Sequence, residues 1–367
     1  MSKPLFHIVL LPLIFMLLAP PVQAEYRLRE IATIGSIPWG LAFIEKDTLL
    51  FTRREGKAGL VNVATGQVRQ LTGIPPVYAE GQGGLLDVAV PPDFQREGWI
   101  YFTYSKPVDG EGATTLARAR LQQDRLTDWT ELLVTDSATD TGYHFGSRIA
   151  FDDQDFVYFG IGDRGERPNS QQRSNHAGSI IRLYRDGRVP ADNPFVGQAD
   201  IHPEIWSYGH RNPQGLAFDP VHKRLWEIEH GPRGGDEINR IEKGKNYGWP
   251  IISYGKEYWG PIDVGEDTHR DGMEQPVKYY VPSIAPGSLI VYRGDIFPDW
   301  NGALMSGALK LRHINIVTLD ELGRETGEQR ILEELGARIR SLAQDKAGYL
   351  YFATDSGKLY VLEPEDH

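Results

Sequence analysis

Residues 148–159 read RIAFDDQDFVYF, which is a short apolar segment, a polar turn and a second apolar segment. Short apolar and aromatic runs bounded by turn residues are typical of β-strands. The pattern recurs along the chain, with further copies that begin at residues 40, 86, 215, 288 and 340. The sequence therefore contains six loosely similar copies of one strand pair, which indicates a repeat architecture.

The number and spacing of these copies predict the fold. Residues 25–367 divided by six give about 57 residues per copy, enough for a four-stranded sheet and one longer loop. The 40 glycines and 24 prolines suit many tight turns. We therefore expect an all-β chain that forms one six-bladed β-propeller with four-stranded antiparallel blades. A β-sandwich or two all-β domains is the alternative, but neither predicts a strand pair that recurs at this spacing.

The N-terminal residues resemble a secretory signal. Lys3 precedes an apolar stretch from Ile8 to Ala19, and small residues at Val22 and Ala24 suit signal peptidase. We expect residues 1–24 to be cleaved, which leaves residues 25–367 as a periplasmic or secreted domain. An uncleaved anchor is the alternative, although the stretch is well short of the ~20 residues that span a bilayer. No later segment is apolar enough to cross a membrane.

Charge and composition exclude several classes of function. The formal net charge is −11, which disfavours attraction to nucleic acid and to anionic lipid. The chain has no cysteine, so it has no disulfides, thiolate metal sites or cysteine nucleophiles. Partners should be small molecules or other proteins, and any metal must bind through oxygen or imidazole.

One motif points to a chemistry that its context contradicts. Residues 160–165 match the G-x-G-x-x-G fingerprint of dinucleotide-binding folds and follow an expected strand. That fingerprint must open a helix, whereas residues 167–170 continue as a polar loop between β-repeats. We therefore do not expect nicotinamide chemistry.

Polar loops near strand ends are the candidates for function, because the loops at one end of a propeller converge on its channel. Gln82 lies in a glycine-rich turn that frees the backbone to approach a ligand, although it can equally be an ordinary turn. His144 and Asp163 flank strands of one expected blade, so a hydrogen bond between them is within reach. A carboxylate that orients a histidine makes it a competent general base, whereas a lone histidine is more often structural.

Two further loops supply cations. Arg211 and Asn212 stand side by side before a strand, and arginine offers planar donors to a carboxylate or a quinone oxygen. Residues 309–312 add a lysine and an arginine, and alternation along an extended chain sends Arg338 and Arg340 to the same side. Cations that converge on a channel predict an anionic ligand. The alternative is that they form surface ion pairs.

Residues 229–239 and 245–250 combine glycines, carboxylates and aromatic side chains. Free backbone carbonyls and carboxylate oxygens are hard ligands, which suit calcium better than zinc. A solvated acidic turn is the alternative interpretation.

Taken in order, the runs at residues 81–86, 211–215 and 230–250 resemble the soluble glucose and aldose sugar dehydrogenases that depend on pyrroloquinoline quinone (PQQ), most closely the aldose sugar dehydrogenase branch. The resemblance implies oxidation of aldose sugars at C1 to lactones by hydride transfer to calcium-bound PQQ. In this interpretation His144 is the general base, Asp163 orients it, and Arg211 polarises the quinone. The implied PQQ contacts are Gln82, His144, Arg211, Asn212, Tyr258, Lys310, Leu311, Arg338 and Arg340.

The resemblance also implies two kinds of calcium site. The carbonyls of Gly231 and Pro232 would hold one calcium ion at the quinone, and a structural calcium would lie near Glu237 and Tyr247. The implied partners are an aldose and an unidentified electron acceptor, and the protein would be a monomer or a homodimer. The alternatives are a calcium-dependent lactonase, which would not need so many cations around the channel, and a non-catalytic sugar-binding propeller.

Overall fold

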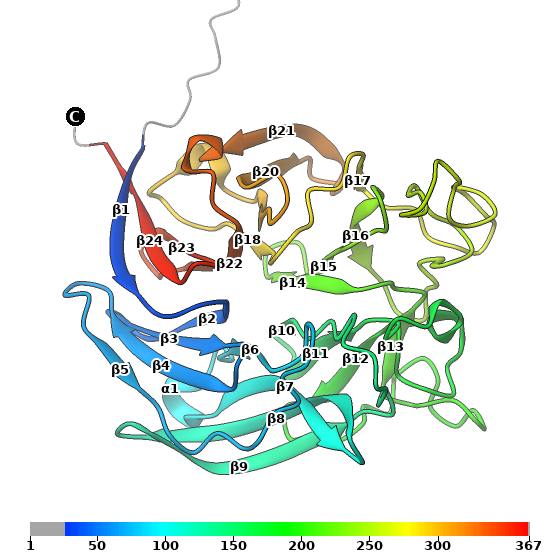
Figure 1. Cartoon of the computed structure of the whole chain (residues 1–367), viewed down its shortest axis with the longest axis horizontal. Helices are drawn as coiled ribbons and strands as arrows, with labels where there is room; N and C mark the ends of the chain where they lie inside the picture. Colours follow the sequence, from blue (N-terminus) through cyan, green and yellow to red (C-terminus); the bar gives the residue numbers. More distant parts are fainter. Residues whose placement is uncertain (1–25, 366–367) are drawn as a thin grey trace, which may run out of the picture.

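The computed structural model describes residues 26–365, so the expected signal peptide lies outside the described residues. Six four-stranded antiparallel sheets are arranged around a common centre (Figure 1). The predicted six-bladed β-propeller is therefore confirmed. Within the described part of the chain, no helix is long and apolar enough to cross a membrane.

Each blade runs from an inner strand at the channel to an outer strand. Blade 1 consists of β2 (Pro38–Glu45), β3 (Thr48–Arg53), β4 (Lys57–Asn62) and β5 (Val68–Gln70), and blade 2 of β6 (Leu85–Ala89), β7 (Ile100–Val108), β8 (Glu111–Gln122) and β9 (Arg125–Val134). Blade 3 consists of β10 (Ile149–Phe151), β11 (Phe156–Ile161), β12 (Ser179–Tyr184) and β13 (Ile205–Tyr208), and blade 4 of β14 (Pro213–Asp219), β15 (Arg224–Glu229), β16 (Asp236–Ile241) and β17 (Lys278–Tyr280). Blade 5 consists of β18 (Ile290–Val291), β19 (Leu304–Gly307), β20 (Ile314–Leu319) and β21 (Glu325–Ile331), and blade 6 of β22 (Ile339–Gln344), β23 (Leu350–Thr354), β24 (Lys358–Pro364) and β1 (Tyr26–Thr33).

The six copies recognised in the sequence coincide with the inner strands of the six blades. Each apolar pair is an inner strand followed by its neighbour, such as β10 and β11 in blade 3. Two of the copies begin with a glycine, and close packing against the next blade requires it at both positions. A Cβ atom at Gly40 would lie 2.6 Å from the backbone nitrogen of Val88, and one at Gly215 would lie 2.6 Å from that of Leu289. Adjacent blades therefore approach each other more closely there than any side chain allows.

The ring is closed by a strand to which the sequence hypothesis assigned no role. β1 pairs antiparallel with β24, from Tyr26 opposite Pro364 to Thr33 opposite Lys358. In Figure 1 the blue β1 lies beside the red β24, so the first and last described strands share one sheet. Both ends of the propeller are thereby joined by hydrogen bonds, and blade 6 gains its outer strand.

Helical structure is sparse in the described residues: α1 (Phe94–Glu97) and the 3-10 helices η1 (Arg167–Gln171), η2 (Pro298–Trp300) and η3 (Glu333–Leu335). The glycines at residues 160–165 end β11, and only the five-residue η1 follows them. The helix that a dinucleotide site needs is not formed there, which confirms the interpretation from sequence context.

Candidate active site

Loops from all six blades surround a cavity of about 200 Å³ at one mouth of the channel. Each of the five polar loops singled out in the sequence contributes at least one lining residue, so their predicted convergence is confirmed. Trp39 and Arg54, which the sequence analysis did not single out, also line it. The full lining is Trp39, Arg54, Gln82, Phe145, Gly146, Gln214, His230, Leu309, Arg338 and Arg340.

His144 stands beside this cavity, in the loop that precedes β10, and is held by two contacts. Its Nδ1 lies 2.6 Å from Oδ1 of Asp163, and its backbone nitrogen donates to Oε1 of Gln82 at 2.9 Å. A carboxylate can only accept, so Nδ1 carries the proton and Nε2 keeps a free lone pair. His144 has a φ of 53°, a left-handed conformation that non-glycine residues rarely adopt and that is common at functional sites.

Asp163 is held rigidly in turn. Its carboxylate accepts the indole Nε1–H of Trp249 at 2.8 Å and the backbone N–H of Gly165 at 2.8 Å. Burial alone would raise the pKa of Asp163, but the hydrogen bond from His144, the positive charge of Arg211 and the Gly165 amide together lower it. The carboxylate is therefore charged and fixed in orientation, as the orienting partner of a general base must be.

Burial dominates the electrostatics of the histidine. Desolvation is the largest cause that lowers the pKa of His144 below 6.5, and the positive charges of Arg211 and Arg164 lower it further. The hydrogen bond to Asp163 acts in the opposite direction and is the smaller effect. The imidazole is therefore neutral at pH 7 and able to accept a proton.

A buried arginine that the sequence analysis did not identify fixes the loop that carries His144. The guanidinium of Arg164 donates to the carbonyls of Tyr143, Gly112 and Thr141, the last two at 3.1 Å, and its Cζ lies 3.4 Å from the ring centroid of Phe145. Burial lowers its pKa to about 10. Arg164 thus holds the backbone that precedes the base through carbonyls, and it contacts the residue that follows the base through the Phe145 ring.

One wall of the cavity carries more positive than negative charge. Asp355 accepts from Nε of both Arg338 and Arg340, each at 2.7 Å. The guanidinium of Arg54, which also lines the cavity, has no hydrogen bond or ion pair among the described residues. Burial, followed by the charge of Arg340, lowers the pKa of Arg54. Three guanidinium groups with one carboxylate favour a ligand that carries more than one negative charge.

Arg211 presents an unused donor close to the same region. It is 7% exposed, its Nη1 donates to the carbonyl of His230 at 3.0 Å, and its Nε is buried without a partner among the described residues. Asn212 accepts the backbone N–H of Gly146 at 3.2 Å through its side-chain oxygen. A buried donor without a partner costs free energy, so the position suits an additional acceptor supplied by a ligand.

Of the nine predicted cofactor contacts, Gln82, Arg338 and Arg340 line this cavity, and the other six do not. His144, Arg211 and Asn212 make the contacts given above, and Arg211 lines a smaller cavity that shares His230. Tyr258 is 66% exposed, on a loop that Arg167 anchors through a bidentate ion pair with Glu257 at 2.7 and 2.8 Å. Lys310 is exposed, and Leu311 is half-buried against an apolar cluster of blades 4 and 5. Their roles toward a cofactor remain predictions from the resemblance.

The predicted calcium ligands have free oxygen atoms. Among the described residues, the carbonyls of Gly231, Pro232 and Tyr247 accept no hydrogen bond. Glu237 and Tyr247 line a cavity of about 10 Å³, which has room for one water molecule or ion. These donors are hard oxygen atoms, so they fit calcium.

An acidic cluster adjoins this small cavity. Glu229 lies directly opposite Glu237 in the pairing of β15 with β16, and Glu227 lies opposite Asn239. Burial raises the pKa of both Glu227 and Glu237 well above the ordinary value, and the charge of Glu229 raises it further. One oxygen of Glu227 and the side-chain oxygen of Asn239 are buried without partners in the described part of the chain. Like charges opposite one another are destabilising, so a bound cation fits this cluster.

Comparison with known proteins identifies the family. Residues 36–361 match the family described as Glucose / Sorbosone dehydrogenase. The chain belongs to this family. Aldose sugar dehydrogenase YliI of Escherichia coli (strain K12) is 40% identical over 336 residues, which cover 90% of each chain. The match to this family makes the chain an oxidoreductase of the sugar dehydrogenase type.

Solved structures of glucose and aldose sugar dehydrogenases share the fold. The soluble aldose sugar dehydrogenase from Escherichia coli in the apo-form superposes with a TM-score of 0.88 at 37% identity, covering 93% of this chain and 100% of that chain. The PQQ-bound form of aldose sugar dehydrogenase from Streptomyces coelicolor superposes with a TM-score of 0.78 at 27% identity, covering 95% and 100%.

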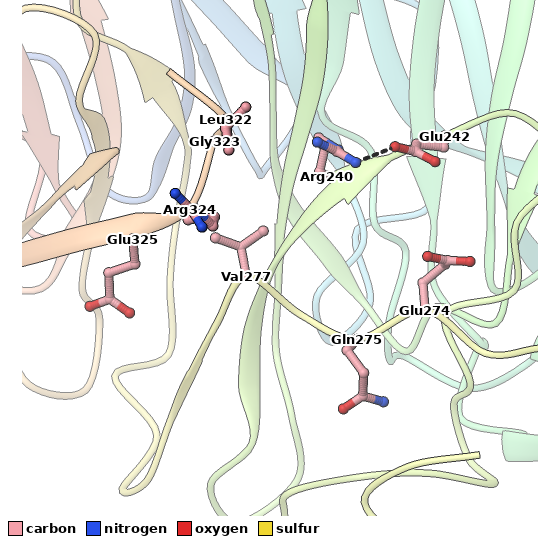
Figure 2. A pocket seen from close by; sticks show the side chains of 9 residues that line it. All are labelled: Arg240, Glu242, Glu274, Gln275, Val277, Leu322, Gly323, Arg324 and Glu325. Carbon is pink, nitrogen blue, oxygen red and sulfur yellow. Dashed lines mark ion pairs between the residues drawn. The ribbon is translucent and has the colours of Figure 1, made fainter. Parts of the chain in front are cut away.

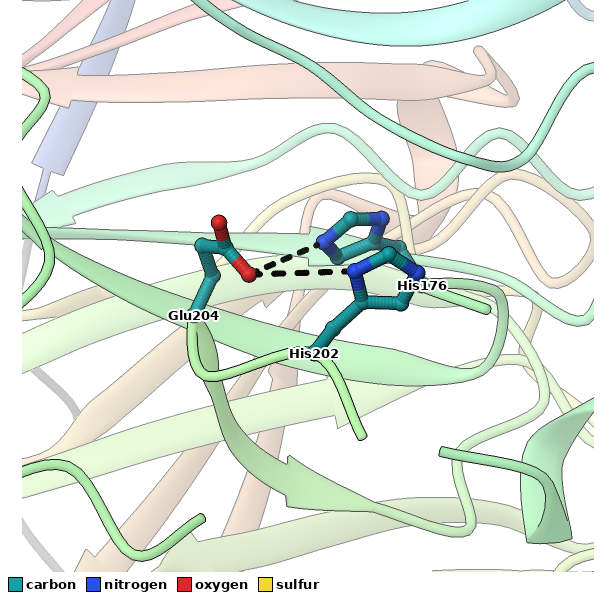
Figure 3. Close-up of side chains that lie close together, drawn as sticks. All are labelled: His176, His202 and Glu204. Atoms are coloured by element: carbon teal, nitrogen blue, oxygen red, sulfur yellow. Dashed lines mark ion pairs between the residues drawn. The ribbon is translucent and has the colours of Figure 1, made fainter. Parts of the chain in front are cut away.

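In this glucose/sorbosone dehydrogenase chain, a group of metal-ligating residues also lies outside the channel mouth. His176, His202 and Glu204 lie together in blade 3 (Figure 3). Nδ1 of His176 accepts the backbone N–H of Asp136 at 2.9 Å, so the proton of the neutral ring is on Nε2, which lies 3.5 Å from Glu204. The two imidazole rings stack at 3.8 Å, so their lone pairs do not converge on one point. This geometry favours a packed polar cluster over a metal site.

A groove of about 480 Å³ on the outer rim is larger than the cavity at the channel mouth but lacks its chemistry (Figure 2). Arg240 and Glu242 form an ion pair there at 2.6 Å, and Glu274 is paired with Lys245 at 2.8 Å. Its charged side chains reach solvent and are of both signs. The channel mouth is therefore the candidate active site of this family member.

Proposed function

We propose that the protein oxidises aldose sugars at C1 to lactones, with calcium-bound PQQ as cofactor and His144 as general base. The observation that carries this proposal is the His144–Asp163 pair, whose free Nε2 stands beside a cavity lined by three guanidinium groups. PQQ is a tricarboxylate, so the excess of positive charge suits it better than a neutral sugar. A lactonase or a sugar-binding propeller would not need these cations.

The residues around the cavity would have separate roles in proton transfer and in cofactor binding. Nε2 of His144 accepts the proton of the anomeric hydroxyl, while Asp163 stabilises the imidazolium that forms and keeps the ring in place. Arg54, Arg338 and Arg340 would hold carboxylates of PQQ, and Arg211 would donate to a quinone oxygen through its unpaired Nε. PQQ, when bound, supplies the acceptor for the hydride that leaves C1 of the sugar.

Calcium would be held by the carbonyls of Gly231 and Pro232 at the cofactor, and by Glu237 and Tyr247 at the structural site. We further propose that residues 1–24 direct export to the periplasm or the medium. The mature protein would act as a monomer or homodimer and pass electrons to an acceptor that is not yet identified.

Reconstitution tests the proposal directly. We expect the purified mature protein to reduce an artificial dye with glucose and other aldoses only when both PQQ and calcium are added. A calcium-chelated sample and a PQQ-free sample are the controls. Hydrolysis of lactones without dye reduction would favour the lactonase, and sugar binding without any redox activity would favour the binding propeller.

The pH profile should report the state of His144. The base must be neutral to act, and burial lowers its pKa, so the acid limb of kcat/KM should lie below pH 6.5. The substitution Asp163→Asn removes the hydrogen bond and the charge that raise this pKa, so the limb should move to still lower pH. The maximal rate should fall by roughly 10²-fold, because the imidazolium loses its partner. An acid limb that moves to higher pH in Asp163→Asn would contradict this assignment.

A further inference from the structure

One buried arginine, Arg148, crosses the channel beneath the candidate site. It is 5% exposed and immediately precedes β10 of blade 3. Its Nη1 donates to Oδ1 of Asp87 at 2.8 Å, and its Nε donates to the carbonyl of Gln214 at 2.9 Å. Its Nη2 donates to the carbonyls of Gly287 and, at 3.3 Å, of Arg340. These partners belong to blades 2, 4, 5 and 6.

The remaining blade is reached through an aromatic ring. The guanidinium carbon of Arg148 lies 4.0 Å from the ring centroid of Trp39 in β2, a cation–π distance. Arg148 itself belongs to blade 3, so its side chain contacts all five other blades of the propeller. A single side chain therefore ties the six inner strands together at one level of the channel.

The ion pair between Arg148 and Asp87 is largely buried, and both carboxylate oxygens of Asp87 accept hydrogen bonds. The two side chains are 7% and 8% exposed, and the second carboxylate oxygen of Asp87 accepts the backbone N–H of Ile149 at 2.9 Å. A buried ion pair is a weak source of stability, because desolvation offsets most of the attraction. In some proteins such a pair instead contributes specificity, because it allows only one conformation of the residues around it.

Arg148 also separates two cavities. Trp39, Gln214 and Arg340, which Arg148 contacts from below, line the cavity at the channel mouth. Arg148 and Asp87 line a second cavity of about 480 Å³ toward the opposite end, which is otherwise formed largely by apolar side chains of the inner strands. The pair is therefore the partition between the candidate active site and the rest of the channel.

We propose that Arg148 and Asp87 are a positioning pair that holds the floor of the cofactor site. By fixing the Trp39 ring and the carbonyls of Gln214 and Arg340, the pair sets the spacing of side chains that face the cofactor, and it closes the channel below them. This inference rests on the proposed function, because it assumes that the ligand of the cavity at the channel mouth is PQQ.

The test replaces both charges at once. Arg148→Met alone would leave a buried, unpaired carboxylate, which destabilises a protein by itself. The double variant D87N–R148M removes both charges and keeps an acceptor for the Ile149 amide. We expect it to fold with a Tm close to that of the wild type, but to bind PQQ in the presence of calcium at least ~10-fold more weakly, a difference of about 1.4 kcal/mol. The measurement is a spectroscopic titration of the calcium-loaded apoprotein.

A second buried arginine, which pairs with an exposed carboxylate away from the channel, provides a control. Arg182 is 4% exposed and pairs with Asp192 at 3.0 Å, but it does not line either channel cavity. The variant D192N–R182M should leave the dissociation constant for PQQ within twofold of the wild type. Wild-type affinity for PQQ in D87N–R148M would overturn the positioning role.

Hydrogen exchange separates this inference from the proposed function. Amides in residues 212–216 and 285–289 should exchange at least ~10-fold faster in D87N–R148M than in the wild type, because the partner that orders their carbonyls is gone. The same amides should be unchanged in D192N–R182M. If the wild type does not bind PQQ, the proposed function fails, and exchange alone decides the positioning role; unchanged exchange in D87N–R148M would overturn it.

Discussion

Replacing His144 with glutamine should lower kcat of the reconstituted enzyme by about 10³-fold, within the range of 10² to 10⁴ that general bases contribute. Glutamine has similar reach but cannot accept a proton at neutral pH. Nδ1 of His144 is engaged by Asp163 at 2.6 Å and only Nε2 is free, so no second nitrogen of this ring can act as the base. Stopped-flow reduction of the cofactor with saturating aldose would measure the effect on the chemical step.

Measuring the affinity of His144→Gln for PQQ shows whether its lower kcat reflects the loss of the base or the loss of the cofactor. The cations of the cavity are untouched in His144→Gln, so the dissociation constant for PQQ should change by only a few-fold. His202→Gln is the matched control, since His202 lies in blade 3 away from the channel mouth and should leave kcat unchanged. Turnover by cofactor-loaded His144→Gln within threefold of the wild type would exclude His144 as the base.

The repeat pattern was predictable because the inner strands are apolar on both sides. β10, β11 and their counterparts pack against neighbouring blades, so their sequences are short continuous apolar runs. β1 could not be predicted in the same way. It is an outer strand with exposed and half-buried residues in mixed order, and its partner β24 lies more than 300 residues away along the chain. Nothing local in residues 26–33 reveals that pairing.

Some residues of the candidate site could be identified from the sequence, and others could not. Gln82, His144 and Arg211 were identifiable because glycines or paired functional groups surround them in the sequence. Arg54 was not, because it stands between Arg53 and Glu55 and has the local signature of an exposed charged turn. Arg148 was recognised only as the first residue of a strand copy. Its four hydrogen-bond partners and the Trp39 ring come from five other segments of the chain, and contacts between such distant segments are visible only in three dimensions.

Removal of calcium should abolish most activity of the reconstituted enzyme and lower its Tm. Blade 4 holds three buried or partly buried carboxylates, Glu227, Glu229 and Glu237, and the last two lie opposite each other in the pairing of β15 with β16. Without a cation they repel one another, and burial adds to the cost of their charges. Calcium present at 1,000 times its dissociation constant would contribute about 4 kcal/mol to stability by mass action. Calorimetry with and without chelator measures this difference.

The substitution Glu237→Gln should change Tm in opposite directions with and without calcium. A glutamate that does not bind calcium would not show this reversal. With one negative charge fewer, the variant should have a higher Tm than the wild type when calcium is chelated. With excess calcium it should have a lower Tm than the wild type, because an oxygen ligand has lost its charge. Glu204→Gln is the control, since Glu204 belongs to the separate cluster with His176 and should leave the calcium dependence of Tm unchanged. If Glu237→Gln shifts Tm in the same direction with and without calcium, the acidic cluster of blade 4 is not the calcium site.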